Sequence, residues 1–495
     1  MILDQDNLAR LPETIQKPRY ERDTCGIGIA HLGIGAFHRA HLASYTDDVL
    51  NMNGGGDWRI KGISLRNTKV RDQLNPQDGR YSLLEKDRTA EHCRIIGAVD
   101  GVLVAPEDPE AVLNLLSDPD TRIISLTVTE KGYCHDPATG RLNMADPDIE
   151  HDLTHPNQPR TAIGYIVASM KRRRASDIPA PTILCCDNLR SNGSTLRGLV
   201  LEFAGLIDPA LADWISEHVS FPNSLVDRIV PATTEKDIEE FAERFGYRDE
   251  GLIITEPFRQ WVIEDNFPLG RPAWHKAGAV MVKDVAVFEE AKLRLLDGSH
   301  TAFGYLGSLA GYEYVHQVME NSNFRTYAKT LLLDEAIPTL KTPPGMDLVQ
   351  YCEEFLDRFA NPALHYKTSQ IASDGSQKLP QRLLNTIRDQ LEGPRHIEGL
   401  SLAIAGWMRY VGGTDEQGNP VDIQDPMADQ LQEISDKSDS TADALVRTYL
   451  NMSEIFGADL KKNEYFTSRV CFWLSNLIDL GSRETLDMFC RTEHY

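Results

Sequence analysis

The chain has 495 residues, of which 41% are hydrophobic and 25% charged, a composition typical of soluble globular proteins. This length favours two or three domains over a single core. The formal net charge of -23 argues against nucleic acid as a partner, because phosphate binding relies on Lys and Arg.

The amino terminus, MILDQDNLARLPETIQ, has acidic residues where a signal peptide has a basic start followed by an apolar run. No later stretch approaches ~18 consecutive apolar residues, so we expect no membrane partner and a cytoplasmic location. The eight cysteines include no CxxC pair and no spacing to His that is typical of a zinc site. We therefore expect reduced thiols and no bound metal.

The first half of the sequence alternates between strand and helix patterns. Residues 26–50, GIGIAHLGIGAFHRAHLASYTDDVL, predict a strand, a Gly-x-Gly turn and a helix. Further strands are predicted at 58–65, 92–99, 122–129 and 181–188, and helices at 108–118, 163–174, 196–206 and 211–219. This alternation is typical of a parallel sheet with right-handed crossovers.

From about Val285 onward, every predicted element is a helix. Helical patterns lie at 288–296, 301–312, 326–336, 347–360, 381–391, 400–411, 442–456 and 465–480. We therefore predict an α/β domain over residues 1–283 and an all-helical domain over 284–495. A small ligand usually binds at the interface between two such domains.

The Gly-x-Gly turn at Gly33 and Gly35 is typical of a dinucleotide site, because glycine lets a pyrophosphate approach the start of the next helix. The third glycine of that pattern is missing, so a tight turn without a ligand is the alternative. His38 and Arg39 would add positive charge in the first turn of the helix. The first acid after the second strand is Asp72, which predicts weak discrimination against a 2′-phosphate.

Two polar residues follow predicted parallel strands. Glu130 comes after the strand at 122–129, and Asn188 ends the strand at 181–188. Ligands bind at the carboxyl edge of open α/β sheets, although either residue could instead cap a helix or a turn. For Asp227, beside Arg228, an internal salt bridge is the default interpretation, and for Lys378 a surface position is.

Three side chains that could carry chemistry lie within AKLRLLDGSH, residues 291–300. At the ~100° per residue of an α-helix, Lys292, His300 and Asp297 fall at roughly 0°, 80° and 140°. They could therefore share one side of a helix as a catalytic group. A polar stripe on a half-buried helix would show the same pattern.

Taken together, these stretches resemble the mannitol dehydrogenase family of long-chain polyol and uronate dehydrogenases. The matching motifs are GIGAFHRAH, SLTVTEKGYC, CDN, FPNSLVDRIVPA, EPFRQWVIEDNF, KLRLLDGSH, DGSQKLPQRLL and AGWMRYVGG. Three of them, TVTEKGYC, EPFRQWVIEDNF and DGSQKLPQRLL, look more like the fructuronate reductase (D-mannonate oxidoreductase) branch than the mannitol 2-dehydrogenase branch. The resemblance implies a Rossmann-type, mostly parallel NAD-binding domain followed by an all-helical substrate-binding domain, in a zinc-independent monomer.

The resemblance also implies roles for individual residues. Lys292 matches the general acid or base, Asn188 an oxyanion donor and His300 the residue that orients the substrate. The other implied catalytic positions are Glu289 and Asp297, and Lys378 joins Asn188, Lys292 and His300 as a substrate-binding position. The implied cofactor-binding positions are Gly33, Gly35, Phe37, His38, Arg39, Glu130, Val226 and Asp227.

Asp297 departs from the pattern, because relatives carry asparagine there as a second oxyanion donor. Hydride reduction of a ketone builds negative charge on oxygen, so neutral N–H donors favour the transition state and an ionised carboxylate opposes it. A protonated aspartate could still donate one hydrogen bond, much as asparagine does.

The leading functional hypothesis is reduction of D-fructuronate to D-mannonate with NADH, with NADP kept as an alternative cofactor. Lys378 and Arg382 are compatible with a uronate substrate. A mannitol 2-dehydrogenase or D-arabinitol 4-dehydrogenase, acting on a polyol, is the alternative within the same class. A different class is an NAD(H)-binding protein with little turnover, which Asp297 keeps open. A zinc-dependent alcohol dehydrogenase would need Cys and His ligand groups that the sequence lacks.

Overall fold

The computed structural model describes residues 3–4, 6–136, 139–363, 366–437 and 441–492, excluding the side chains of Glu130 and Lys437. The chain divides into two compact units, Met1–Ala286 and Val287–Tyr495. The division lies close to the boundary predicted between residues 283 and 284. The fold class predicted from the sequence, a Rossmann-type sheet domain followed by a helical domain, is confirmed.

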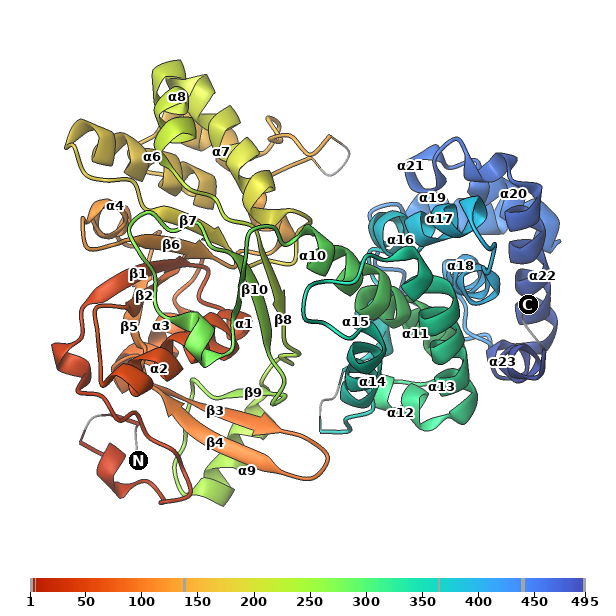
Figure 1. The fold of residues 1–495 in the computed structure, drawn as a ribbon, viewed down its shortest axis with the longest axis horizontal. Helices are drawn as coiled ribbons and strands as arrows, with labels where there is room; N and C mark the ends of the chain where they lie inside the picture. Colours follow the sequence, from red (N-terminus) through yellow and green to blue (C-terminus); the bar gives the residue numbers. More distant parts are fainter. Residues whose placement is uncertain (1–2, 5, 137–138, 364–365, 438–440, 493–495) are drawn as a thin grey trace. The chain divides into compact units, whose positions relative to one another are not determined.

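The amino unit is built on a five-stranded parallel sheet in the order β5–β2–β1–β6–β7 (Figure 1). Its strands are β1 Ile27–Leu32, β2 Arg59–Ser64, β5 Val99–Val104, β6 Ile123–Leu126 and β7 Thr182–Cys185. The chain extends from β1 to one side and then returns to β6 on the other side. This reversal of strand order is the point at which open α/β sheets bind ligands, beyond the carboxyl ends of the strands.

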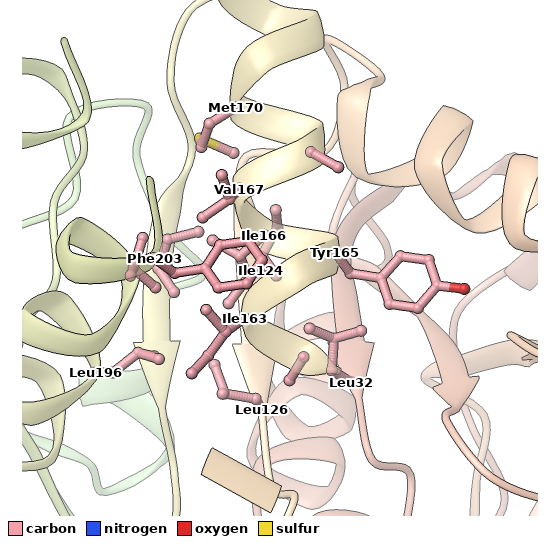
Figure 2. Packing of buried hydrophobic residues seen from close by; sticks show 14 of the residues in the cluster. Leu32, Ile124, Leu126, Ile163, Tyr165, Ile166, Val167, Met170, Leu196 and Phe203 are labelled. Atoms are coloured by element: carbon pink, nitrogen blue, oxygen red, sulfur yellow. The ribbon is translucent and has the colours of Figure 1, made fainter. Parts of the chain in front are cut away.

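The sheet is buried on both faces, as the apolar pattern at 122–129 predicts. Ile124 and Leu126 of β6 pack with Ile163, Ile166 and other residues of the helices on one face (Figure 2). The alternate residue Ile123 joins the core of the opposite face. The first face is covered by α4 Pro109–Ser117, α6 Ala162–Ala175, α7 Asn192–Ile207 and α8 Pro209–His218.

Two small sheets complete the amino unit. One has the order β4–β3–β9 and the other β11–β10–β8. The bounds are β3 Tyr81–Lys86, β4 Glu91–Ile96, β8 Ser224–Asp227, β9 Ile253–Thr255, β10 Gln260–Glu264 and β11 Val280–Val282. The remaining helices are α1 Ala36–Ala40, α2 Leu42–Asn53, α3 Lys69–Leu74, α5 Pro147–Thr154 and α9 Glu235–Phe245.

The prediction that residues 92–99 form a strand of the parallel sheet is wrong. They contribute β4, which pairs antiparallel with β3 through Tyr81↔Ile96 in a separate sheet. The parallel sheet takes β5 instead, which begins at Val99. A short apolar run indicates a buried strand but does not say which sheet it joins or in which direction.

The carboxyl unit is helical, and its described residues form no strand. Its α-helices are α10 Ala286–Lys292, α11 Gly298–Leu309, α12 Val315–Glu320, α13 Ser322–Lys329, α14 Leu348–Phe359, α15 Thr368–Ala372, α16 Gly375–Leu379, α17 Asn385–Glu392, α18 Glu398–Tyr410, α19 Ala428–Lys437, α20 Ala442–Leu450, α21 Ser453–Phe456, α22 Glu464–Leu480 and α23 Ser482–Arg491. Helix α18 packs against both α11 and α22 (Figure 1). No described helix of the chain is long and apolar enough to span a membrane.

Three helices predicted as continuous contain π-helical segments. These are η6 Leu293–Asp297, η7 Thr330–Ala336 and η9 Pro380–Leu384. A π-helix closes its hydrogen bonds between residues i and i+5, and such segments occur frequently at functional sites.

Candidate active site

The Gly-x-Gly turn directly follows β1. Gly33 has a φ of 87°, and a Cβ there would lie 2.1 Å from the Thr127 carbonyl oxygen, so only glycine fits. Gly35, the N-cap of α1, has a φ of -83°, and a Cβ there would meet only the Gly33 carbonyl oxygen, at 3.9 Å. Glycine at position 35 is therefore not required by packing within the chain. An open backbone at this point fits the approach of a dinucleotide pyrophosphate.

The aromatic and basic residues after this turn are more buried than the sequence suggests. His38 is 0% exposed, and its ring stacks on His31 with centroids 3.5 Å apart. Burial lowers the pKa of His38 well below 6.5, and electrostatic interactions with His31 and Arg39 lower it further. The prediction that His38 adds positive charge is therefore wrong. Phe37 is half-buried and stacks on His41 at 5.0 Å.

Arg39 is a cation, but its guanidinium is buried within the amino unit. Its Nη1 donates to the Gly251 carbonyl at 2.9 Å, and its side chain is buried. The backbone carbonyl of Arg39 in turn accepts a hydrogen bond from Tyr81 Oη at 2.6 Å. These contacts give Arg39 a structural role in joining α1 to the small sheet that contains β3.

Asp187 joins the ends of two neighbouring parallel strands. It follows β7, and its carboxylate accepts hydrogen bonds from the backbone N–H groups of Val128 at 2.8 Å and Thr129 at 3.1 Å, both after β6. Tyr133 Oη donates to the same carboxylate at 2.6 Å. Thr129 has φ 64° and ψ 162°, a strained conformation that residues other than glycine rarely adopt. The sequence analysis did not identify Asp187, although it belongs to the CDN motif.

Glu130 and Asn188 lie where the sequence places them, after the carboxyl ends of β6 and β7. Glu130 begins the short helix η4, Glu130–Tyr133, and its side chain lies outside the described part of the chain. Asn188 is exposed and directly follows Asp187. Strained Thr129 therefore directly precedes Glu130, and Asp187, which binds the backbone of Thr129, directly precedes Asn188.

Val226 and Asp227 lie at the end of β8, with exposures of 5% and 7%. The neighbouring Arg228 forms an internal salt bridge, because its Nη2 lies 2.5 Å from Glu85 Oε1. Arg228 also donates to the Glu256 carbonyl at 2.7 Å. The basic residue of this motif therefore ties β8 to β3.

The loop after β2 is where a Rossmann-type site usually holds the adenosine ribose. Arg66 and Lys69 are exposed there. The first acid, Asp72, accepts hydrogen bonds from Thr68 Oγ1 and Arg71 Nε at 2.6 Å each. These hydrogen bonds lower the pKa of Asp72 and engage its carboxylate at the start of α3.

The second group of candidates lies in the carboxyl unit, where α10, η6 and α11 follow one another. Lys292 ends α10, Asp297 ends η6 and His300 lies in the first turn of α11. Their exposures are 7%, 5% and 6%. Lys292 Nζ lies 3.8 Å from Asp297 Oδ2. The π-helical segment brings these two residues, five apart, closer in rotation than the roughly 140° of an α-helix.

The π-helical segment is held by contacts from the following helix and from η9. Thr301 Oγ1 donates to the Asp297 carbonyl at 2.7 Å, and Arg382 Nη1 donates to Thr301 Oγ1 at 3.0 Å. A Cβ at Gly298 would lie 3.0 Å from the Arg382 carbonyl oxygen, so the two segments pack closely. The ring of His300 stacks on Phe359 with centroids 4.6 Å apart.

The last two predicted residues differ in their surroundings. Glu289 is half-buried in α10, one turn before Lys292. Lys378 Nζ donates to the Ser373 carbonyl at 2.6 Å, to Ser373 Oγ at 3.3 Å and to the Ile371 carbonyl at 3.4 Å. These contacts tie α16 to α15 and engage the ammonium of Lys378, which was predicted to bind the substrate.

Among the described residues, no group of three or more His, Cys, Asp and Glu side chains is arranged to hold a metal ion.

Comparison with known proteins gives matches along nearly the whole chain. Residues 27–276 match the mannitol dehydrogenase Rossmann domain, and residues 284–477 match the mannitol dehydrogenase C-terminal domain. The chain is 45% identical to the uncharacterized oxidoreductase YeiQ of Escherichia coli (strain K12), over 96% of this chain and 97% of YeiQ. It is 44% identical to D-mannonate oxidoreductase of the same organism, over 95% of this chain and 97% of the relative.

A solved structure is similar over its full length. It is the ternary complex of Pseudomonas fluorescens mannitol 2-dehydrogenase with NAD and D-mannitol, which is 39% identical and has a TM-score of 0.89. The match covers 100% of both chains. A D-mannonate oxidoreductase and a mannitol 2-dehydrogenase are therefore similar to this chain to nearly the same degree.

Proposed function

Because the chain belongs to the mannitol dehydrogenase family, we propose that it is an NAD-dependent oxidoreductase that interconverts D-fructuronate and D-mannonate. The observation that carries the reaction type is buried Lys292, whose Nζ lies 3.8 Å from Asp297 Oδ2. The choice of D-fructuronate as substrate rests on the 44% identity to D-mannonate oxidoreductase and on the motifs TVTEKGYC, EPFRQWVIEDNF and DGSQKLPQRLL.

Reduction adds a hydride to the keto carbon and a proton to the keto oxygen. The nicotinamide supplies the hydride when it is bound, and Gly33 and Gly35 form the turn that would hold the pyrophosphate. The ammonium of Lys292 donates the proton to the keto oxygen, and in the reverse direction the amine accepts it. Burial and the carboxylate of Asp297 fix the ammonium in place before the reaction.

Neutral donors complete the proposed site. Asn188 is assigned by family resemblance as an N–H donor to the oxygen on which negative charge develops. His300, with its ring fixed against Phe359, orients the substrate hydroxyl groups. Glu289, one turn from Lys292, is proposed to relay a proton to solvent. This scheme uses no metal ion, because Lys292 supplies both the proton and the positive charge.

The remaining predicted residues are proposed to bind cofactor or the substrate carboxylate. Glu130, Val226 and Asp227 are assigned to the cofactor by family resemblance. A uronate carries a carboxylate that a polyol lacks, so it needs a cationic partner. Lys378 is already engaged by three oxygen atoms of α15 and the adjoining loop, so it binds the carboxylate only by exchanging one of them.

The test is a substrate panel with NADH and with NADPH. We expect fructuronate to have a higher kcat/KM than fructose or xylulose with NADH. Turnover of fructose that equals or exceeds that of fructuronate would favour the mannitol 2-dehydrogenase alternative. The 39% identity to the solved mannitol 2-dehydrogenase supports that alternative. Binding of NADH in a fluorescence titration without oxidation by any substrate would favour a binding protein with little turnover. Activity abolished by a chelator and restored by Zn²⁺ would contradict the metal-free scheme.

A further inference from the structure

A cavity of about 580 Å³ opens at the amino ends of β2 and β5. β1 runs parallel to both strands through the sheet order β5–β2–β1, and it ends at Leu32, just before the Gly33 turn. Arg59 begins β2, and Asp100 is the second residue of β5. The cavity therefore lies at the edge of the sheet opposite the turn that fits the cofactor pyrophosphate.

Four cationic side chains line this amino-edge cavity. They are Arg22, Arg59, Lys61 and Arg80. Asp100 accepts from Arg59 Nη1 at 2.5 Å and from Lys61 Nζ at 3.0 Å. Burial opposes ionisation of Asp100, but the hydrogen bond and charge of Lys61 and the charges of Arg59 and Arg22 outweigh it and lower its pKa. Asp100 is therefore fully occupied as the shared partner of two cations.

Arg22 is a buried cation without a carboxylate contact in the described part of the chain. It is 9% exposed, and it donates from Nε to the Gly97 carbonyl at 2.9 Å and from Nη2 to the Val99 carbonyl at 2.5 Å. Buried charges in proteins are usually paired. Burial and the positive charges of Arg80 and Arg59 lower the pKa of Arg22, and the attraction of Asp100 only partly offsets them. A bound anion would relieve this repulsion.

Two guanidinium groups that line the cavity keep donors without a hydrogen-bond partner in the described part of the chain. Nη1 of Arg22 and Nη2 of Arg59 make no hydrogen bond within the described part of the chain, and neither atom is sealed from solvent. The planar N–H pairs of arginine match the oxygen atoms of a phosphate group. Lys61, whose side chain is 23% exposed, adds an ammonium that also lines the cavity and makes one hydrogen bond, to Asp100, within the described part of the chain.

We propose that the amino-edge cavity binds a phosphate group, either as inorganic phosphate or as part of a small phosphorylated sugar. A phosphate offers more acceptor oxygens and more charge than a carboxylate, which suits two guanidinium groups and an ammonium. The two other acids that line the cavity do not oppose it strongly, because Asp78 pairs with Arg80 at 2.8 Å and Asp23 is exposed. The volume lies within the roughly 300–1,000 Å³ of small-molecule sites and leaves room for a sugar.

Calorimetric titration at constant ionic strength tests the proposal, with inorganic phosphate, glucose 6-phosphate and glucose as probes. We expect saturable binding of at least one phosphate compound at millimolar concentrations and no binding of glucose. Tighter binding of glucose 6-phosphate than of inorganic phosphate identifies a phosphorylated sugar as the ligand, and the reverse order identifies free phosphate. The affinity for NADH should be unchanged by either compound, because the two sites lie at opposite edges of the sheet.

Two variants locate the site. Lys61→Met and Arg22→Gln should each weaken phosphate binding about tenfold or more, as expected for the loss of a charged hydrogen-bond donor. The control Lys236→Met removes an exposed ammonium and should bind phosphate as the parent does. If Arg22→Gln does not fold, Lys61→Met decides alone, because the one hydrogen bond that Lys61 makes within the described residues is to Asp100. Absence of saturable binding, unchanged affinity in Lys61→Met or competition with NADH would overturn the proposal.

Discussion

Lys292 and Asp297 face one another across a π-helical turn, with 3.8 Å between Nζ and Oδ2 and with both side chains buried. The family resemblance implies asparagine at the position of Asp297. An ionised carboxylate beside an oxygen that gains negative charge opposes the reaction, although it also holds the ammonium of Lys292. The Lys292–Asp297 pair is therefore the feature of this site that departs from the pattern implied by the family resemblance.

The first prediction is that Asp297→Asn is active and has a higher kcat at alkaline pH. The gain should reach up to about hundredfold, the scale of one oxyanion donor. The measurement is kcat for both across the pH range, with Tm as a control, because breaking a buried ion pair also destabilises the fold. A parent faster than the variant at every pH would mean that the carboxylate itself promotes turnover.

A second prediction concerns the strained turn at Thr129, with φ 64° and ψ 162°. Glycine adopts this conformation without the steric penalty, so Thr129→Gly should raise the free energy of unfolding by about 1 kcal/mol, or the Tm by about 2 °C. The matched control is Thr448→Gly, which replaces an exposed helical residue of α20 and should lower the Tm. A lower Tm for Thr129→Gly would show that the turn is not strained.

Asp187 should act as a positioning residue at the same turn. Its carboxylate accepts from Val128 and Thr129, and it precedes Asn188. We expect Asp187→Ala to lower kcat about tenfold or more, because a misplaced donor no longer meets the developing charge. Asp187→Asn keeps one acceptor oxygen and should recover part of the rate. Equal loss in both variants, in proportion to their loss of Tm, would indicate a purely structural role.

The pH dependence of stability tests Glu335, whose carboxylate caps the start of α18. Its oxygens accept from the backbone N–H groups of Gly399 at 2.6 Å and Leu400 at 2.8 Å. Burial outweighs these hydrogen bonds and raises the pKa of Glu335 from 4.5 to about 8. Folding then favours the protonated form, so its stabilising contribution is full below pH 4.5 and is lost as the pH rises through about 8.

The measurement is the Tm of the parent and of Glu335→Gln, which cannot ionise, across the same pH range. The Tm of the parent should fall relative to the variant as the pH rises. Glu320→Gln, at an exposed position, is the control and should leave the pH profile of the parent unchanged. A constant difference between the parent and Glu335→Gln would show that this carboxyl does not titrate in that range.

Cofactor preference can be tested at the loop after β2. NADH should be preferred, but NADPH should also be used, because Arg66 and Lys69 are exposed and Asp72 is engaged by Thr68 and Arg71. We expect Arg66→Gln to lower kcat/KM for NADPH more than for NADH. Arg88→Gln, in the turn between β3 and β4, should change neither value. Undetectable use of NADPH by the parent would mean that another group excludes the 2′-phosphate.

Local sequence patterns were enough to predict the alternating strands and helices of the amino unit and the all-helical carboxyl unit. The apolar residues that are buried in β6 and α18 form recognisable patterns within those segments. The partner of a strand was not predictable in this way, as residues 92–99 show, since a short apolar run carries no information about pairing. The π-helical segment was also missed, because its i to i+5 hydrogen bonds leave no distinct signal in LRLLD. The neutral state of His38 and the contacts of Asp187 depend on residues distant in sequence, such as His31 and Val128.

The most direct test of the proposed mechanism is the turnover of Lys292→Ala with whichever substrate of the panel the parent reduces fastest. The variant should bind NADH with unchanged affinity in a fluorescence titration and lose kcat by about 10³-fold or more, because the proton donor and the positive charge disappear together. The control Lys329→Ala, at an exposed lysine of α13, should match the parent in both measurements. A Lys292→Ala enzyme that binds NADH and keeps about a tenth of the parental kcat would contradict the assignment of Lys292 as the acid and base of this reaction.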